Sequence, residues 1–154
     1  MGVRSIIAIL LMLATAACST YRREFDANPP FAPHFYRSFD VEVAWQAERT
    51  GQDVRLSGTV TNRRYPYLRD LGLTARLFDE KGNVLARETD DDFPTYIPSG
   101  KGAPFHVILT LPDGTTPARL RFNYTYFLAE EPPAFGGYGG YDDTPHFGNF
   151  DAPL

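Results

Sequence analysis

The stretch L-G-L-T-A-R-L-F-D-E-K-G-N-V-L-A-R-E at residues 71–88 decides the fold class. Its first half alternates apolar with other residues one by one, which is the pattern of a strand that buries one face. Gly82 lies where the chain must reverse, because a residue without Cβ can adopt the positive φ that short hairpin loops need. Asp79 and Asn83 tolerate turn geometry and hydrogen-bond nearby backbone. The stretch therefore predicts two antiparallel strands joined by a turn at 79–83.

Four other segments show the same alternation, at residues 39–48, 54–61, 104–111 and 118–128. Their inner faces are expected to carry Phe39, Val41, Val43 and Trp45; Val54, Leu56, Gly58 and Val60; Phe105, Val107, Leu109 and Leu111; and Leu120, Phe122, Tyr124 and Tyr126. Gly58 is expected to mark a bulge or a close approach between sheets. After residue 17 no stretch has a convincing helical period. The sequence therefore predicts an all-β protein with a single antiparallel β-sandwich, at residues 38–129.

Composition limits the class of partner. The chain has 154 residues, which suits a single domain, and its 15 basic and 19 acidic residues give a net charge of −4. Loss of a leader containing Arg4 would leave 14 against 19, or −5. A surface that binds nucleic acid needs a basic patch to replace counterions, and no long basic run is present. We therefore expect no nucleic-acid partner.

Residues 1–17 have the organisation of an export signal. Arg4 supplies positive charge, residues 6–13 are apolar, and small residues follow. The apolar run is too short to remain as a membrane-spanning helix. The one cysteine of the chain, Cys18, comes next, and T-A-A-C at 15–18 resembles the lipobox of bacterial lipoproteins. That resemblance implies cleavage before Cys18 and a covalent lipid on it, with diacylglycerol on the thiol and a further acyl chain such as palmitate on the new amino terminus.

The lipoprotein resemblance also implies a location. Several acyl chains give stable membrane anchoring where one alone is marginal. Ser19 rather than Asp follows the cysteine, which by analogy with the bacterial sorting rule indicates the outer membrane of the cell envelope, facing the periplasm or the cell surface. Thr15 departs from the Leu that the family prefers. The alternative is an ordinary signal peptide cleaved after Ala17, which would leave a free thiol in an exported chain.

Both flanks of the predicted domain look unlike domain material. Residues 18–37 read as a Pro-rich tether, whose aromatic side chains either dock its last part on the domain edge or contact lipid headgroups or a partner. Residues 130–154 read as a flexible, low-complexity tail. In it, Tyr138 and Tyr141 alternate with glycine and would either contact a protein or glycan surface or have no role.

Several segments resemble the FxLYD-type domains of bacterial envelope proteins. They are V-R-L-S-G-T-V-T-N from Val54, A-R-L-F-D-E-K-G-N-V ending at Val84, I-P-S-G-K-G-A-P-F from Ile97, and the final aromatic strand. The resemblance covers residues 39–128, with L-F-D where the family often has L-Y-D and Ala75 in place of its upstream aromatic residue. It implies an immunoglobulin-like β-sandwich of about six to seven strands in an extracytoplasmic setting. It implies no catalytic residues.

Catalytic and metal-binding patterns were sought and are weak. Three adjacent carboxylates at residues 90–92 suggest calcium, but they lack the alternating spacing of a cation-binding loop. His34, His106 and His146 show no metal-ligand spacing. The cysteine is assigned to the anchor, and no nucleophile elbow is present. We therefore expect no enzyme activity, no metal and no cofactor beyond the lipid; a small metal-dependent hydrolase using His106 with residues 90–92 is the rival.

The expected function is non-catalytic: a lipid-anchored envelope protein that binds or scaffolds another envelope component. Residues 62–70 are a polar and aromatic link, whose Tyr65, Tyr67 and Arg69 are of the types that form contacts. The same link could be a plain solvated connection. Candidate binding residues are therefore Tyr65, Tyr67, Arg69, Tyr138 and Tyr141, and binding of glycan or peptidoglycan through the tyrosines is an alternative to a protein partner. The oligomeric state is left open, since an exposed sheet edge could pair two copies.

Overall fold

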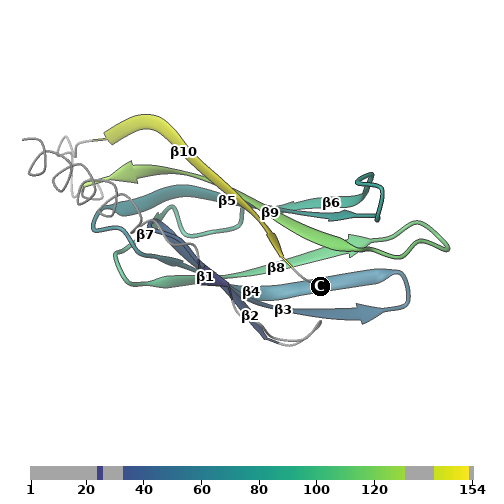
Figure 1. Cartoon of the computed structure of the whole chain (residues 1–154). Coiled ribbons are helices and arrows are strands. Elements are labelled where there is room, and N and C mark those ends of the chain that lie inside the picture. Colours follow the sequence, from purple (N-terminus) through teal and green to yellow (C-terminus); the bar gives the residue numbers. More distant parts are fainter. Residues whose placement is uncertain (1–23, 26–32, 131–140, 153–154) are drawn as a thin grey trace, which may run out of the picture.

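The computed structural model describes residues 24–25, 33–130 and 141–152. Those residues form strands and connecting turns, and two antiparallel sheets pack face to face (Figure 1). The prediction of an all-β protein with a single antiparallel β-sandwich is confirmed. Within the described ranges there is no helix that is long and apolar enough to cross a membrane.

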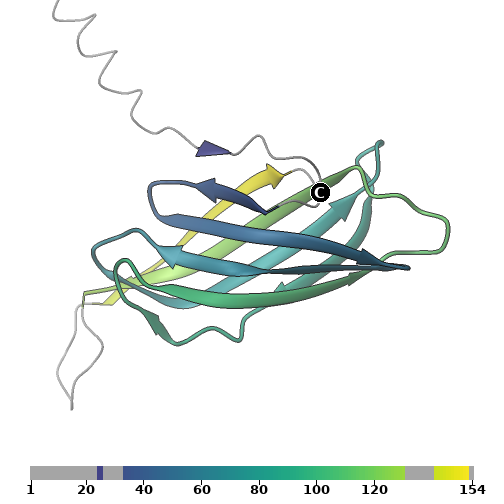
Figure 2. The same cartoon turned by 90° about the horizontal axis from the view of Figure 1, so that it is seen from below.

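The two sheets bring together segments that are distant in the sequence (Figure 2). Sheet A has the order β1 (Glu24–Phe25), β2 (His34–Arg37), β3 (Val41–Thr50), β4 (Asp53–Asn62) and β8 (Gly102–Thr110). Sheet B has the order β10 (Tyr141–Ala152), β9 (Arg119–Ala129), β5 (Tyr67–Phe78) and β6 (Val84–Asp90), with β7 (Tyr96–Ile97) beside β5. The described residues form ten strands, more than the six to seven expected. The additional strands are the two-residue β7 and three strands in segments that were predicted as flanks, namely β1, β2 and β10.

The hairpin predicted at 71–88 is the β5–β6 pair. Its turn is held by the Asp79 carboxylate, which accepts hydrogen bonds from the backbone N–H of Asn83 at 2.8 Å and from its side-chain amide at 2.8 Å. Gly82 has a φ of 85°, so the glycine occupies the left-handed conformation that this position requires. The strand begins earlier than expected, at Tyr67, which makes part of the predicted link into sheet.

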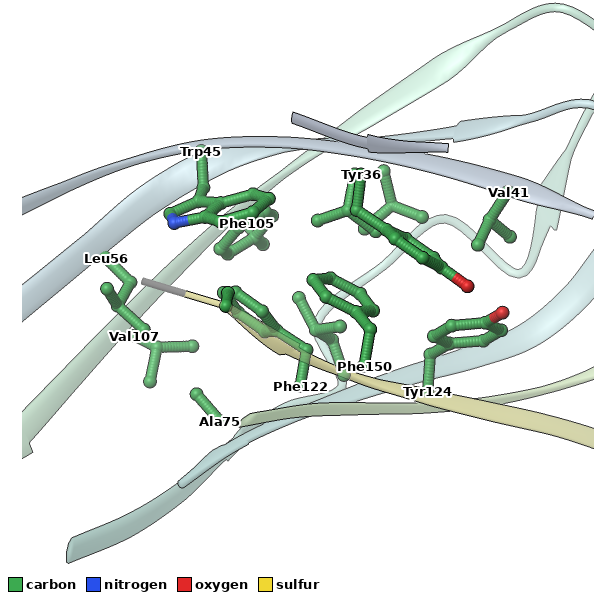
Figure 3. Close-up of a cluster of buried hydrophobic side chains, with 14 of the residues drawn as sticks. Tyr36, Val41, Trp45, Leu56, Ala75, Phe105, Val107, Phe122, Tyr124 and Phe150 are labelled. Carbon is green, nitrogen blue, oxygen red and sulfur yellow. The ribbon is translucent and has the colours of Figure 1, made fainter. Parts of the chain in front are cut away.

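The alternating side chains build the core as predicted, with one exception. The inward positions of β3, β4, β8 and β9 are buried, including Trp45, Leu56, Phe105 and Phe122 (Figure 3). Phe39, expected to be inward, is 55% exposed. The strand begins only at Val41, because the backbone N–H of Ser38 donates to the Val41 carbonyl at 2.9 Å and forms a turn there.

Gly58 marks a close approach, but within sheet A rather than between the sheets. It pairs with Trp45 on β3 and with Phe105 on β8. A Cβ at this position would lie 2.7 Å from a ring carbon of Phe105 and would meet the carbonyl oxygen of Ala44. The Phe105 ring therefore occupies the space that a side chain at position 58 would need.

The described parts of both flanks belong to the sandwich. Docking of the tether's last part is confirmed, because β2 pairs with β3 along its whole length. The prediction of a flexible tail at 130–154 is wrong for residues 141–152, which form β10 on β9. The Phe150 ring on β10 stacks on the Tyr36 ring on β2, with centroids 3.8 Å apart and planes 13° apart (Figure 3). The predicted domain limits of 38–129 therefore exclude two strands that meet across the core.

The register between β10 and β9 explains how so polar a segment joins the sheet. His146 pairs with Tyr126 and stacks on it at 5.3 Å. Gly148 pairs with Tyr124, whose ring lies where a Cβ would be. Phe150 pairs with Phe122 in turn, so the inner face of β10 is shaped to three aromatic residues of β9. The inner side chains of β10, among them the buried Phe150, therefore fit against aromatic residues of its neighbour β9.

Candidate functional site

The outer face of sheet B brings three arginines into line across three strands. The register pairs Arg121 on β9 with Arg76 on β5, and Arg76 with Arg87 on β6. We call these three residues the arginine row. Asp151 on β10 pairs with Arg121 and ends the row on the other side. Neighbouring strands lie about 4.8 Å apart, so the guanidinium groups start from closely spaced backbones.

One end of the row is neutralised and held in place. The Arg121 guanidinium donates to both oxygens of the Asp151 carboxylate, at 2.5 and 2.9 Å, and Arg119 lies 3.5 Å from one of them. This pairing lowers the pKa of Asp151 and raises that of Arg121. The guanidinium carbons of Arg119 and Arg121 lie 4.7 and 5.5 Å from the centroid of the Phe78 ring, which is only 7% exposed. Two arginines are therefore stacked on one aromatic ring.

The other end of the row has no such partner. Among the described residues, neither Arg76 nor Arg87 forms an ion pair, and the buried Nε of Arg76 has no hydrogen-bond acceptor. Arg76 has an arginine directly opposite on each side. Like charges directly opposite each other in a sheet are destabilising. The arrangement therefore costs stability and provides two arginines that can bind an anion.

A row of neutral polar side chains lies beside the arginine row on the same face. The register aligns Asn149, Asn123, Thr74 and Thr89 from β10 across to β6. The hydroxyls of Thr74 and Thr89 share a hydrogen bond of 2.9 Å. The buried side-chain oxygen of Asn123 has no hydrogen-bond partner among the described residues. We call these four residues the polar row, and it offers both donors and acceptors.

Tyr65, Tyr67 and Arg69 lie at the far end of the same sheet. Tyr67 and Arg69 belong to β5, not to a link, and only Tyr65 lies in the loop, where it is 93% exposed. The Tyr67 ring meets that of Tyr96 edge-on at 6.4 Å. Arg69 lies 5.1 Å over the Phe127 ring, with the Asp70 carboxylate 3.3 Å from its Nε. The three predicted residues thus lie at one end of β5 and in the loop before it, and Arg69 already contacts Phe127 and Asp70.

Of the two tail tyrosines and the lipidation site, the structure describes only the backbone of Tyr141. Tyr141 lies in β10 and pairs with Ala129, but its side chain is outside the described residues. Tyr138 and Cys18 also lie outside them. The backbones of Tyr141 and Tyr67 both pair with Ala129, from opposite sides of β9, so Tyr141 lies at the same end of sheet B as Tyr67 and Arg69.

His106 and residues 90–92, the residues of the alternative metal-dependent hydrolase, lie close together, and backbone hydrogen bonds to Asp90 connect them. The Asp90 carboxylate accepts a hydrogen bond from the backbone N–H of His106 at 2.8 Å and one from that of Asp92 at 3.1 Å. It thereby caps a backbone donor on the free edge of β8. In residues 24–25, 33–130 and 141–152, no three His, Cys, Asp or Glu side chains are grouped as metal ligands would be.

Two surface hollows lie away from the arginine row, and both are shallow. One, of about 320 Å³, lies between the hairpin turn at Asp79–Lys81 and residues 116–118. The other, of about 310 Å³, lies over Gly58 on the outer face of sheet A. Neither encloses a small molecule as a typical ligand pocket does.

Sequence reasoning missed the arginine row. Arg119 and Arg121 were expected to point away from the core, but nothing connected them with Arg76 or Arg87. The outward phase of Arg76 and Arg121 follows from the alternation, whereas the segment of Arg87 does not alternate, and the common row required the register between strands. Comparison with known proteins adds no assignment: no protein-family model matches the chain, and no curated protein matches it.

Proposed function

We propose that this protein is a non-catalytic, lipid-anchored protein of the bacterial cell envelope that binds or scaffolds another envelope component through the outer face of sheet B. The anchor is the covalent lipid on Cys18, and the expected membrane is the outer one. The leader followed by T-A-A-C supports the anchor. The FxLYD-type resemblance of residues 39–128 supports an extracytoplasmic setting for the domain.

One observation carries the binding part of the proposal, namely the arginine row. The whole chain is acidic, with a net charge of −4, yet one face aligns three arginines, one of them between two others. Such a row costs stability in the isolated protein. A bound anionic partner would offset that cost, which gives a physical reason for the arrangement.

Site-specific photo-crosslinking in cells tests the binding face. A photoreactive residue in place of Thr125 reports on the outer face of sheet B, and one in place of Ser57 reports on the outer face of sheet A. Both positions are exposed. We expect envelope material to be captured from position 125 and not from position 57. Equal capture from both positions, or none from either, would contradict the proposed face.

A separate measurement tests the anchor. Cells grown with labelled palmitate should label the protein, and Cys18→Ser should abolish both the label and the membrane association of the chain. A Cys18→Ser protein that fractionates with the membrane as before would refute anchoring by a lipid on this residue.

A further inference from the structure

We infer that the envelope component bound by sheet B is an anionic glycan, a linear polysaccharide that bears carboxylate or phosphate groups. The arginine row would hold the anionic groups, and the polar row beside it would hydrogen-bond the sugar hydroxyls. The inference deepens the proposed function, because it names the partner of the same face.

The unpaired end of the row fits an anion that has repeated charged groups. Arg121 is already paired with Asp151, so Arg76 and Arg87 are the arginines left for a ligand. They come from adjacent strands about 4.8 Å apart. A chain molecule with repeated charges can place one group at each of these two arginines, which a single small anion does only by sharing its oxygens between them.

Arginine suits this role for reasons of geometry. Its planar guanidinium presents a fixed fork of donors that matches carboxylate and phosphate oxygens. Arg119 and Arg121 are held against the Phe78 ring, so one end of the site is already ordered before a ligand arrives. Little side-chain entropy remains to be lost at that end on binding.

The polar row supplies what a sugar needs in addition to charge. Asn123 is in register with Thr74, two residues along from the Arg121–Arg76 pair, so both rows lie on one face. The side-chain oxygen of Asn123 has no donor among the described residues, and a buried acceptor left unpaired is costly. Repacking around a bound hydroxyl could satisfy it, while Thr89 offers an exposed hydroxyl.

An anionic lipid surface is the other anionic partner available in an envelope, and the face fits it less well. Attraction to a membrane depends on the number of basic groups near it and on apolar side chains that enter the interface. Here Arg76 is half-buried and Arg121 is paired. The four side chains of the polar row are hydrogen-bonding groups, whereas the side chains that enter a membrane interface are apolar. The glycan is therefore the occupant that uses both rows.

The test is direct binding by the mature, unacylated chain, with the leader removed and Cys18→Ser. The probes are polygalacturonate, which carries carboxylates, a phosphomannan, which carries phosphates, neutral dextran, and vesicles with anionic lipid. The variants are Arg87→Gln, the pair Arg76→Gln with Arg87→Gln, and Arg55→Gln as the matched control. Arg55 is exposed on the outer face of sheet A. Calorimetric titration at two salt concentrations measures the affinities.

We expect one or both anionic glycans to bind at least tenfold more tightly than dextran, with an affinity that falls as salt rises. The double variant should bind about tenfold more weakly or worse, and Arg87→Gln should be intermediate. Arg55→Gln should match the parent chain. The tighter of the two glycans identifies the anionic group. Because Arg87 is exposed and lies opposite Arg76, its single variant should keep or slightly raise the parent unfolding midpoint, so a loss of binding would not come from unfolding.

Four results would overturn the inference: no binding of either anionic glycan, equal binding of dextran, an unchanged affinity in the folded double variant, or tighter binding to vesicles than to both glycans. The last would assign the row to a lipid surface. None of these measurements uses the acyl anchor, so failure of the glycan inference and failure of anchoring at Cys18 are separately visible.

Discussion

The packing of β10 makes a sharp prediction, because two phenylalanines on this strand face opposite ways. Phe150 is 2% exposed and Phe147 is 79% exposed. Phe150→Ala removes a ring from the core, and Phe147→Ala removes one from the surface. The two variants change the composition of the chain identically, so any difference between them comes from the tertiary structure.

The expected magnitude follows from what the Phe150 ring touches. Its centroid lies 3.8 Å from that of Tyr36, 5.1 Å from that of Phe122 and 5.8 Å from that of Trp45. Truncation of a buried Phe to Ala costs about 3–5 kcal/mol, and each lost aromatic pair adds to the loss of buried area. We expect a loss of about 4 kcal/mol from the free energy of unfolding. Phe147→Ala should change it by less than about 0.5 kcal/mol.

Urea unfolding of the mature, unacylated chain measures both effects. Trp45 is the only tryptophan of the chain and lies beside Phe150, so its fluorescence reports on this part of the core. Circular dichroism of the same samples reports on the sheets as a whole. A flexible tail predicts changes near zero for both variants. Equal effects of the two substitutions, or a loss below about 1 kcal/mol for Phe150→Ala, would refute the packing of β10.

Three further predictions concern single groups. Gly148→Ala should lower the free energy of unfolding by about 1–3 kcal/mol, because its Cβ would meet the buried Tyr124 ring. In the same urea assay the control Gly72→Ala should cost clearly less, since its Cβ meets only the Thr125 hydroxyl at 3.3 Å. Equal costs for the two variants would contradict the register between β10 and β9. Burial raises the pKa of Tyr124 to about 12, so the stability that is present below about pH 10 should be lost as pH rises toward 12. Ultraviolet titration should show a tyrosine that ionises above the ordinary tyrosine range. Tyr124→Phe should make the loss of stability at alkaline pH smaller. The ion pair with Arg121 lowers the pKa of Asp151, so the stability that this pair contributes should be complete at neutral pH and be lost as pH falls below about 4. NMR titration of the Asp151 carboxylate measures its pKa. A pKa at the ordinary Asp value would contradict the pairing.

Local patterns were sufficient for most of the sandwich. The hairpin at 71–88 was predictable because alternation and a turn glycine act within a few residues of each other, and the structure places the Asp79–Asn83 turn as expected. Phe39 shows the limit of the same pattern: it continues the alternation of β3, but a turn at Ser38 places it before the strand begins. Alternation predicts which face a side chain takes only while the backbone stays extended.

The sequence by itself determined the all-β class, the inward residues of the five alternating segments apart from Phe39, and the expectation of an exported, acylated chain. Only the tertiary structure showed that β2 and β10 complete the sandwich. Phe150 stacks on Tyr36 of β2 in the opposite sheet, and Gly148 leaves room for the Tyr124 ring of the neighbouring strand β9. The arginine row was likewise hidden, since its members come from three strands and are adjacent only in one register. Burial and alternation act along the chain, whereas register and sheet packing act between segments that are far apart in it.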